Sequence, residues 1–358
     1  MRVLYLTFDD LSRPFAWSVH VRAIVNRLAA RGHAVRLVAP GGVAPGIDAP
    51  CDPIPPGRLQ HLFGSLRAFT DAGRAFAPDV VYVRGIHLTR TPARAAETLG
   101  RPLVVELNGL LENEIQGFFR RALVRASHRF TLSRAARVVT VSPLLRDALA
   151  GRYGFPAERI DVVPNGADTG LFRPADPGEA RRRLGLPADR PVVLCVASFY
   201  PHHALDVLLR AVSGTGALLV LVGAQGPVPE GVVSAGPVPH ERVPDYVAAA
   251  DLCAFTHRPP DPALGCSPVK LYEYMAGGRP VAVATEMEET RRFVSENGIG
   301  LAVPLDAEAL AGALARLLRD PEERARMGAR GRELAVSTYN WDRAARQVEE
   351  ALQKAGVV

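Results

Sequence analysis

Short apolar runs alternate with amphipathic stretches along the first half of the chain. Between the first two runs, apolar side chains recur at helical spacing from about Ser18 to Arg31. A strand, a helix and a strand in so short a span are typical of a parallel sheet covered by helices on both faces. The runs that we expect to form buried strands are 2–7, 34–39, 80–83, 103–107 and 138–141.

A second alternating series follows a loosely patterned stretch with Pro and Gly at 172–190, which we interpret as a hinge. Its expected strands are 191–197, 218–222, 252–255, 281–284 and 300–303, and three tail helices are expected at 307–318, 321–337 and 341–355. We predict an α/β protein with two Rossmann-like domains that face a cleft. The expected boundaries are 1–168 for the first domain, 169–338 for the second and 339–358 for a final helix that returns to the first.

Composition narrows the class of protein without naming a function. The 358 residues are 48% hydrophobic and 22% charged, as in ordinary globular proteins, and the net charge of +6 does not argue for nucleic acid. The four cysteines form no C-x-x-C pair, and Cys195 lies within an apolar run, where a buried reduced thiol is expected. We find no secretory signal and no run long enough to span a membrane, so a cytoplasmic location is expected.

The stretch 265–284 holds the strongest candidate for a binding site. Ser267 is a suitable N-cap and Pro268 a suitable first residue for a short helix, whose free backbone N–H groups can hold a phosphate. Lys270 adds a cation one turn into the helix, and Glu273 is placed to accept hydrogen bonds from ribose hydroxyls. The alternative is a capped helix with a solvated Lys270–Glu273 pair.

A basic stretch at 116–130 also allows two interpretations. Its arginines and apolar residues could place an amphipathic helix on an anionic membrane surface. Alternatively, the arginines face water while Phe119, Leu123 and Phe130 pack against the sheet. We favour packing, because a helix is needed here to cover the sheet, and peripheral membrane contact is not favoured.

Several of these segments together resemble the retaining glycosyltransferases of the two-Rossmann (GT-B) type, in the large group that includes glycosyltransferase family 4. The resemblance covers nearly the whole chain. Its strongest part is Ser-Pro-Val-Lys-Leu-Tyr-Glu-Tyr-Met-Ala-Gly-Gly-Arg-Pro at 267–280. Further parts are the first helix with its Gly-His-x-Val ending at 18–35, the interdomain segments 139–143 and 160–168, and the tail from Asp320 to Trp341.

The resemblance implies a nucleotide-sugar donor site in the second domain. Glu273 matches the second Glu of the family's Glu-x7-Glu motif, which binds ribose, and Lys270 with the helix amides near Ser267 and Leu271 would face the diphosphate. Gly236 and Val238 match the segment that frames the nucleobase.

In the first domain, the resemblance places His20, Asn108 and Gly109 near the acceptor and the sugar. His20, Asn108 and Lys270 are therefore our candidates for catalytic residues. Asp9, Asp10 and Glu112 follow strand ends in that domain, and we predict that they form a partly acidic wall for an amine-bearing acceptor, with solvated surface carboxylates as the alternative.

Three departures from the family pattern concern the donor. The first Glu of the motif falls at Gly265 and is absent. The pair of cations that clamps the diphosphate becomes Ser198 and His203, and a histidine after the fourth strand becomes Asn108. We expect Lys270, or Arg258 in the loop before it, to supply the missing charge.

We therefore predict a glycosyltransferase that moves a sugar from a nucleoside diphosphate sugar, with a UDP-sugar favoured, to a saccharide, an aminocyclitol or another small acceptor with retention. The helix N-terminus and Lys270 would stabilise the leaving diphosphate, so no metal and no cofactor are expected, and His202-His203 is not interpreted as a metal site. The alternatives are a catalytically quiet binding subunit of the same fold and another nucleotide-dependent enzyme, such as an oxidoreductase. No G-x-G-x-x-G follows a strand to support the oxidoreductase.

Overall fold

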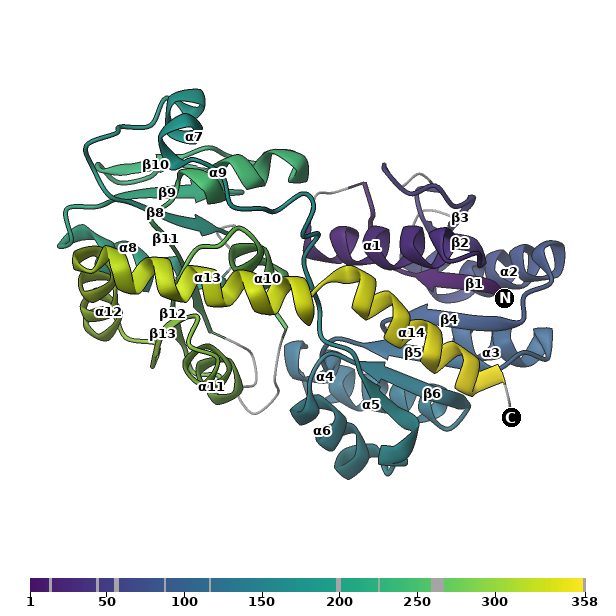
Figure 1. The fold of residues 1–358 in the computed structure, drawn as a ribbon. Coiled ribbons are helices and arrows are strands. Elements are labelled where there is room, and N and C mark those ends of the chain that lie inside the picture. Colours follow the sequence, from purple (N-terminus) through teal and green to yellow (C-terminus); the bar gives the residue numbers. More distant parts are fainter. Residues whose placement is uncertain are drawn as a thin grey trace. The chain divides into compact units, whose positions relative to one another are not determined.

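The computed structural model describes residues 1–12, 15–42, 45–54, 58–86, 88–115, 117–197, 201–224, 226–258 and 267–356, with side chains except at 58–63 and 114. The predicted donor residue Ser198 and the motif position Gly265 lie outside the described residues. The chain divides into two compact units (Figure 1). The first unit holds the described residues within 1–165 and 341–356 together with Ser267, and the second holds those within 166–258 and 268–340.

The first unit is built on a parallel sheet of seven strands within the described chain. The order is β3-β2-β1-β4-β5-β6-β7, so the direction of winding reverses between β1 and β4. Four of the five residues of the strand Val80–Arg84 and all five of Leu103–Leu107 are buried, because helices cover both faces. The strands are β1 Arg2–Thr7, β2 Ala34–Pro40, β3 Cys51–Ile54, β4 Val80–Arg84, β5 Leu103–Leu107, β6 Ala135–Thr140 and β7 Ile160–Val162.

The helices of the first unit come from both ends of the chain. The last helix packs against the first and against strands β4, β5 and β6, so the predicted return of the C-terminal helix is confirmed (Figure 1). The helices are α1 Ala16–Ala30, α2 Arg58–Phe76, α3 Thr91–Leu99, α4 Leu111–Glu114, α5 Phe118–Leu132, α6 Pro143–Tyr153 and α14 Trp341–Gly356, with a 3₁₀ turn at Ala157–Arg159.

The second unit repeats the architecture with a parallel sheet of six strands in its described part. The order is β10-β9-β8-β11-β12-β13, and the winding reverses between β8 and β11. Cys195 is buried on β8 as expected, and burial raises the pKa of its thiol to about 11. The strands are β8 Val192–Val196, β9 Leu218–Val222, β10 Val232–Ser234, β11 Leu252–His257, β12 Val281–Thr285 and β13 Gly300–Val303.

The helices of the second unit include a short one that the sequence analysis did not predict. This helix, at 177–184, lies in the stretch interpreted as a hinge, where Asp176 accepts a hydrogen bond from the Glu179 N–H and Pro177 begins the first turn. The helices are α7 Pro177–Leu184, α8 Leu205–Ser213, α9 Val243–Ala249, α10 Val269–Ala276, α11 Glu288–Glu296, α12 Ala307–Arg319 and α13 Pro321–Ser337, with 3₁₀ turns at Pro201–His203 and His240–Arg242.

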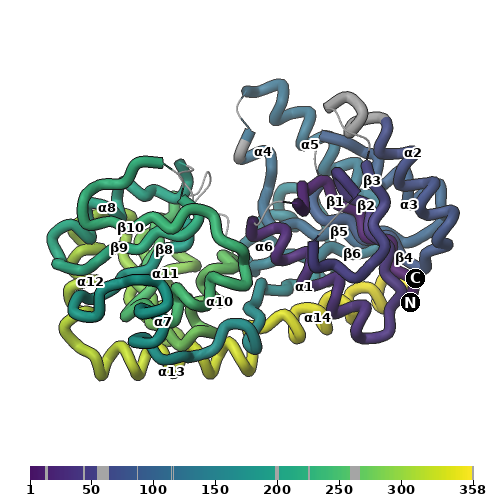
Figure 2. The backbone as a smooth tube through the Cα atoms, turned by 90° about the horizontal axis from the view of Figure 1, so that it is seen from above, coloured from purple at the N-terminus to yellow at the C-terminus, as the bar shows by residue number. Residues whose placement is uncertain are grey.

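The basic stretch forms α5, but the favoured orientation of this helix is wrong. Phe119 and Leu123 do not pack inward: their exposed fractions are 86% and 56%. Of the three predicted inward residues, only Phe130 packs, partly buried, against the core of the first unit. The face that packs inward instead carries Val124, Ser127 and His128. Figure 2 shows α4 and α5 next to each other at one edge of the first unit. Among the described residues, none of the helices is long and apolar enough to span a membrane.

Candidate functional site

The edge of the second sheet at the carboxyl ends of β8 and β11 is the natural ligand site of this unit, because the strand order reverses there. Lys270 on α10 lies at this edge, with Nζ 5.6 Å from the centre of the Phe255 ring. Burial first, and then the charge of Lys270, lower the pKa of His257, at the end of β11, to about 4. The fold therefore holds an ammonium group where an anionic part of a ligand would benefit from it.

The beginning of α10 differs from the prediction. The helix starts at Val269 with Pro268 as its N-cap, and no side chain caps it, so the predicted Ser267 cap is wrong. Ser267 Oγ instead accepts a 3.0 Å hydrogen bond from the Asn165 N–H, and Asn165 Nδ2 donates to the Ser267 carbonyl at 2.6 Å. Leu271 is buried in the core, and its N–H donates to the Pro268 carbonyl at 3.0 Å. Lys270 therefore remains the best supported contact for a diphosphate at this helix.

Glu273 lies one turn further along α10 and is nearly fully buried. Its Oε1 is 2.6 Å from Nε2 of His240, whose ring packs 5.4 Å from that of Phe172. The solvated Lys270–Glu273 pair, the alternative interpretation, does not form. Among the described residues only His240 engages the carboxylate, which leaves Oε2 available to a ligand hydroxyl.

Two loops bring two more predicted donor residues to the same edge: His203 lies in the loop before α8, and Arg258 directly follows β11. Thr256 on β11 donates hydrogen bonds to the carbonyls of His203, at 2.6 Å, and Ala204, at 3.0 Å. The Arg258 N–H donates to the His202 carbonyl at 2.8 Å. Because the His202 ring lies 6.0 Å from that of His257, His203 and Arg258 belong to the same neighbourhood as Lys270.

Ala204 has an unfavourable backbone conformation, with φ of 45°. The left-handed region favours glycine, so we expect Ala204→Gly to raise the free energy of unfolding of the second unit by about 1 kcal/mol. Ala211→Gly, in the last turn of α8, is the control with the opposite sign, because glycine weakens a helix. Urea unfolding followed by circular dichroism measures both, and a loss of stability in Ala204→Gly would contradict the assignment of strain.

Gly236 and Val238 lie after β10, next to the carboxyl end of β9. Gly236 has φ of 64°, and its carbonyl accepts a 2.7 Å hydrogen bond from the Gly223 N–H. Val238 is partly buried and packs against the core of the second unit. The segment is thus fixed in place by the sheet, and its predicted contact with a nucleobase stays a prediction.

The first sheet carries a buried charged network where its own winding reverses, between β1 and β4. Asp9, just after β1, forms an ion pair with Arg84 at the end of β4, and Arg84 Nε is 3.5 Å from Glu106 Oε1 on β5. Tyr82 donates a 2.6 Å hydrogen bond to Glu106. Burial raises the pKa of Glu106, but His20, Arg84 and Tyr82 together lower it to about 2, so this carboxylate is charged.

Two predicted catalytic residues contact this network. His20 on α1 is 6% exposed, with Nε2 2.8 Å from Glu106 Oε1 and Nδ1 2.8 Å from Asn165 Oδ1. Nδ1 is hydrogen-bonded to Asn165, and Nε2 lies within ion-pair distance of Glu106 without an aligned hydrogen bond, so His20 is held as a buried link between these elements. Asn108 Nδ2 donates to Glu106 Oε1 at 2.8 Å, whereas its Oδ1 is buried with no hydrogen-bond partner among the described residues. Asn108 is thus the better candidate for contact with a sugar hydroxyl.

The three carboxylates of the predicted acceptor wall have different surroundings. The Asp9 carboxylate is neutralised by Arg84, and that of Asp10 accepts hydrogen bonds from the N–H and hydroxyl of Ser12 on an exposed loop. Glu112 is buried against His128, Tyr153 and Arg152, where it joins α4 to α5 and α6. A continuous acidic wall is therefore not supported, and Glu112 is a structural residue.

Sequence reasoning missed several residues of these networks, among them Glu106, Arg84 and His240. Glu106 did carry a signal, since a carboxylate inside an apolar strand requires a buried partner. Arg84 and His240 carried none that a single sequence shows, because their partners come from other strands and helices.

Two doubly wound parallel sheets are the fold of GT-B glycosyltransferases. Over 99% of both chains, the structure superposes on sucrose-phosphate synthase from Thermosynechococcus elongatus with a TM-score of 0.78 and 22% identity. Anabaena HepE in complex with UDP-glucose gives a TM-score of 0.79 at 20% identity, again over 99% of both chains. At these identities the likeness shows the fold alone.

The sequence shows the family. The model of Glycosyltransferase Family 4 matches residues 18–171, and that of Glycosyl transferases group 1 matches 190–320. The chain therefore belongs to the glycosyltransferases that combine these two domains, as the resemblance in its sequence indicated.

Curated relatives agree with this assignment. The chain is 29% identical to D-inositol 3-phosphate glycosyltransferase from Acidothermus cellulolyticus, over 91% of this chain and 82% of the relative. It is 33% identical to the GDP-mannose-dependent alpha-(1-6)-phosphatidylinositol monomannoside mannosyltransferase of Mycolicibacterium smegmatis, over 58% of this chain and 59% of the relative. Alpha-D-kanosaminyltransferase from Streptomyces kanamyceticus is 27% identical over 74% of each chain.

Proposed function

We propose that this glycosyltransferase moves a sugar from a nucleoside diphosphate sugar, with a UDP-sugar favoured, to a saccharide, an aminocyclitol or another small acceptor. The observation that carries the proposal is the pair of groups on α10. Lys270 offers a cation at the switch point of the second sheet, and Glu273, one turn later, keeps one carboxylate oxygen without a partner among the described residues. A cation suits the diphosphate of such a donor, and a carboxylate oxygen suits the hydroxyls of the adjacent ribose.

The donor would bind to the second unit. Lys270, helped by Arg258 and His203 from the neighbouring loops, would neutralise the charge that develops on the leaving diphosphate. Glu273 Oε2 would accept a hydrogen bond from a ribose hydroxyl, while His240 holds Oε1. Gly236 and Val238 would contact the nucleobase.

The acceptor would bind to the first unit, near Asn108. The orphaned Oδ1 of Asn108 supports this placement, because a buried oxygen without a donor is expected to receive one from a ligand or a water. Two of the relatives are named for inositol compounds, which favours an acceptor that carries a cyclitol, and a third is named for the amino sugar that it transfers. Asp10, on the exposed loop after β1, stays our candidate for contact with an amine-bearing acceptor.

We infer a retaining, metal-independent reaction from the family and from the charges on α10. The bond from the anomeric carbon to the diphosphate breaks as the acceptor oxygen bonds to the same face of the sugar. The acceptor's proton passes to the departing phosphate. Lys270 would provide the electrostatic stabilisation that a divalent metal ion provides in other transferases, so activity in the presence of a chelator is the expected result.

Thermal-shift titration with UDP-, GDP- and dTDP-sugars tests the donor site. A true donor at 100 times its Kd should stabilise the protein by about 2.7 kcal/mol, and this shift should be lost in Lys270→Ala and reduced in Glu273→Ala. Incubation of that donor with saccharide and cyclitol acceptors, followed by NMR of the product, then reports the anomeric configuration. An inverted product would contradict retention.

The alternative is a catalytically quiet subunit of the same fold. It is favoured by His203 at the position where the family has a lysine, since neutral imidazole is a weaker partner for phosphate. The absence of a thermal shift with all three nucleotide sugars would support this alternative and contradict our proposal.

A further inference from the structure

Helix α5 exposes large apolar side chains at its first turns. The exposed fractions of Phe118, Phe119 and Leu123 are 80%, 86% and 56%, and the two phenyl rings lie 5.7 Å apart. Single exposed apolar residues are common, but two adjacent phenylalanines with a leucine one turn later form a patch that water solvates poorly. Such a patch indicates that this surface contacts another apolar phase.

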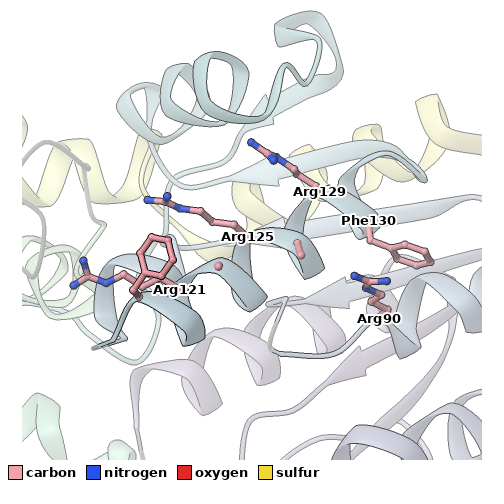
Figure 3. A pocket seen from close by; sticks show the side chains of 8 residues that line it. Arg90, Arg121, Arg125, Arg129 and Phe130 are labelled. Atoms are coloured by element: carbon pink, nitrogen blue, oxygen red, sulfur yellow. The ribbon is translucent and has the colours of Figure 1, made fainter.

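The same helix is strongly basic. It carries Arg120, Arg121, Arg125 and Arg129 and no carboxylate, and none of these arginines forms an ion pair within the described chain. Arg121, Arg125 and Arg129 follow each other at intervals of four residues, so they lie along one face. Figure 3 shows these three side chains extending from the helix. Together with Arg90 they line a hollow of about 710 Å³.

The opposite face of α5 is fixed to the protein, so the patch cannot turn inward. Val124 is completely buried. His128 Nε2 is 3.0 Å from the carbonyl of Ile86, and its Nδ1 is 3.0 Å from Glu112 Oε2. Because buried polar contacts hold one side of the helix, the fold itself determines that the arginines and phenylalanines lie on the exposed side.

We propose that α5 binds the protein to an anionic lipid surface, in the plane of the interface. Phe118, Phe119 and Leu123 would enter the boundary between headgroups and acyl chains, and the row of arginines would bind lipid phosphates. A soluble polyanion would need the arginines alone, whereas this helix combines cations that form no ion pair with exposed apolar rings. The proposal goes beyond the glycosyl transfer above and does not depend on which acceptor is used.

Sedimentation with lipid vesicles tests the proposal on the full chain. We expect the protein to sediment with vesicles of equal parts phosphatidylcholine and phosphatidylglycerol, and at least tenfold less with phosphatidylcholine alone. Arg121→Ser/Arg125→Ser/Arg129→Ser should bind roughly 100-fold more weakly, because each cation contributes roughly fivefold at an anionic surface. Phe118→Ser/Phe119→Ser should lose at least tenfold. The matched control, Arg173→Ser/Arg182→Ser/Arg326→Ser, removes three exposed arginines of the second unit and should bind like the wild type.

A second measurement detects contact with the lipid directly and not through a loss of binding. In Phe118→Trp, the new indole should be quenched by brominated lipid in anionic vesicles, above the background of the unchanged protein, whose Trp17 and Trp341 lie elsewhere. Wild-type protein that remains in the supernatant, or an indole that stays unquenched in Phe118→Trp, would overturn the proposal. Heparin binding that is equal in the wild type and in Phe118→Ser/Phe119→Ser, without vesicle binding, would identify a soluble polyanion as the partner instead.

Discussion

Replacing Lys270 with alanine is expected to lower kcat/KM for glycosyl transfer by about 100- to 1000-fold, the loss typical of one group that stabilises developing negative charge. The ammonium lies at the switch point of the second sheet, beside Phe255 and His257. The measurement is the transfer rate with the donor that gives the largest thermal shift. Lys270→Arg keeps the charge and should recover part of the activity.

The sequence provides a matched control for this test, since Lys270 and Lys354 are its only lysines. Lys354 lies on α14 and pairs with Asp161 at 3.0 Å, so Lys354→Ala should leave the transfer rate unchanged. Acetylation followed by mass spectrometry gives a second readout without catalysis: the bound donor should protect Lys270 and not Lys354. If Lys270→Ala kept its activity within threefold, or if the donor left Lys270 open to acetylation, the diphosphate would bind elsewhere.

Replacing Glu106 with alanine is expected to destabilise the first unit by about 3–5 kcal/mol, because it leaves buried charged and polar partners without their carboxylate. Arg84, Tyr82, His20 and Asn108 all contact this side chain, which is only 1% exposed. Urea unfolding followed by circular dichroism measures the loss. Glu97→Ala, which breaks a half-exposed pair with Arg134, is the control and should cost less than about 1 kcal/mol.

The Glu106 carboxylate should also make the free energy of unfolding depend on pH, and the direction of this dependence follows from its pKa. Because the network lowers the pKa of Glu106 from 4.5 to about 2, its contribution to stability is fully present above pH 4.5 and is lost as the pH falls towards 2. The difference in the free energy of unfolding between the wild type and Glu106→Gln should therefore shrink over this range. A difference that stays constant from pH 6 to pH 3 would show that the network does not depend on the charge of Glu106.

The sequence alone predicted the architecture well. Strands β1, β2, β4, β5 and β6 of the first sheet and the three tail helices follow from short apolar runs and helical periodicity, which are properties of neighbouring residues. Helix α7 was also within reach, because Asp176, Pro177 and Glu179 form a helix-start signal in the stretch interpreted as a hinge. The family assignment rested on contiguous motifs in the same way.

The partners of polar side chains could not be predicted, because they are set across the fold. Ser267 has the sequence of a helix cap, yet its hydroxyl accepts from Asn165, 102 residues earlier in the chain. The Glu273 carboxylate pairs with His240 rather than with Lys270 three residues away. For both side chains, a partner positioned by tertiary packing replaced the one suggested by sequence spacing.

Helix α5 is a further example in which the local sequence predicts the element and tertiary packing decides its orientation. Its sequence determined that an amphipathic, basic helix would form, but periodicity does not specify which face the sheet will cover. The structure buries the face of Val124 and His128, because Ile86 and Glu112 offer the imidazole two partners there, and it leaves Phe118 and Phe119 exposed. Local pattern thus determined the elements and the family, and only the three-dimensional arrangement of partners decided which side chains are engaged and which remain available for binding.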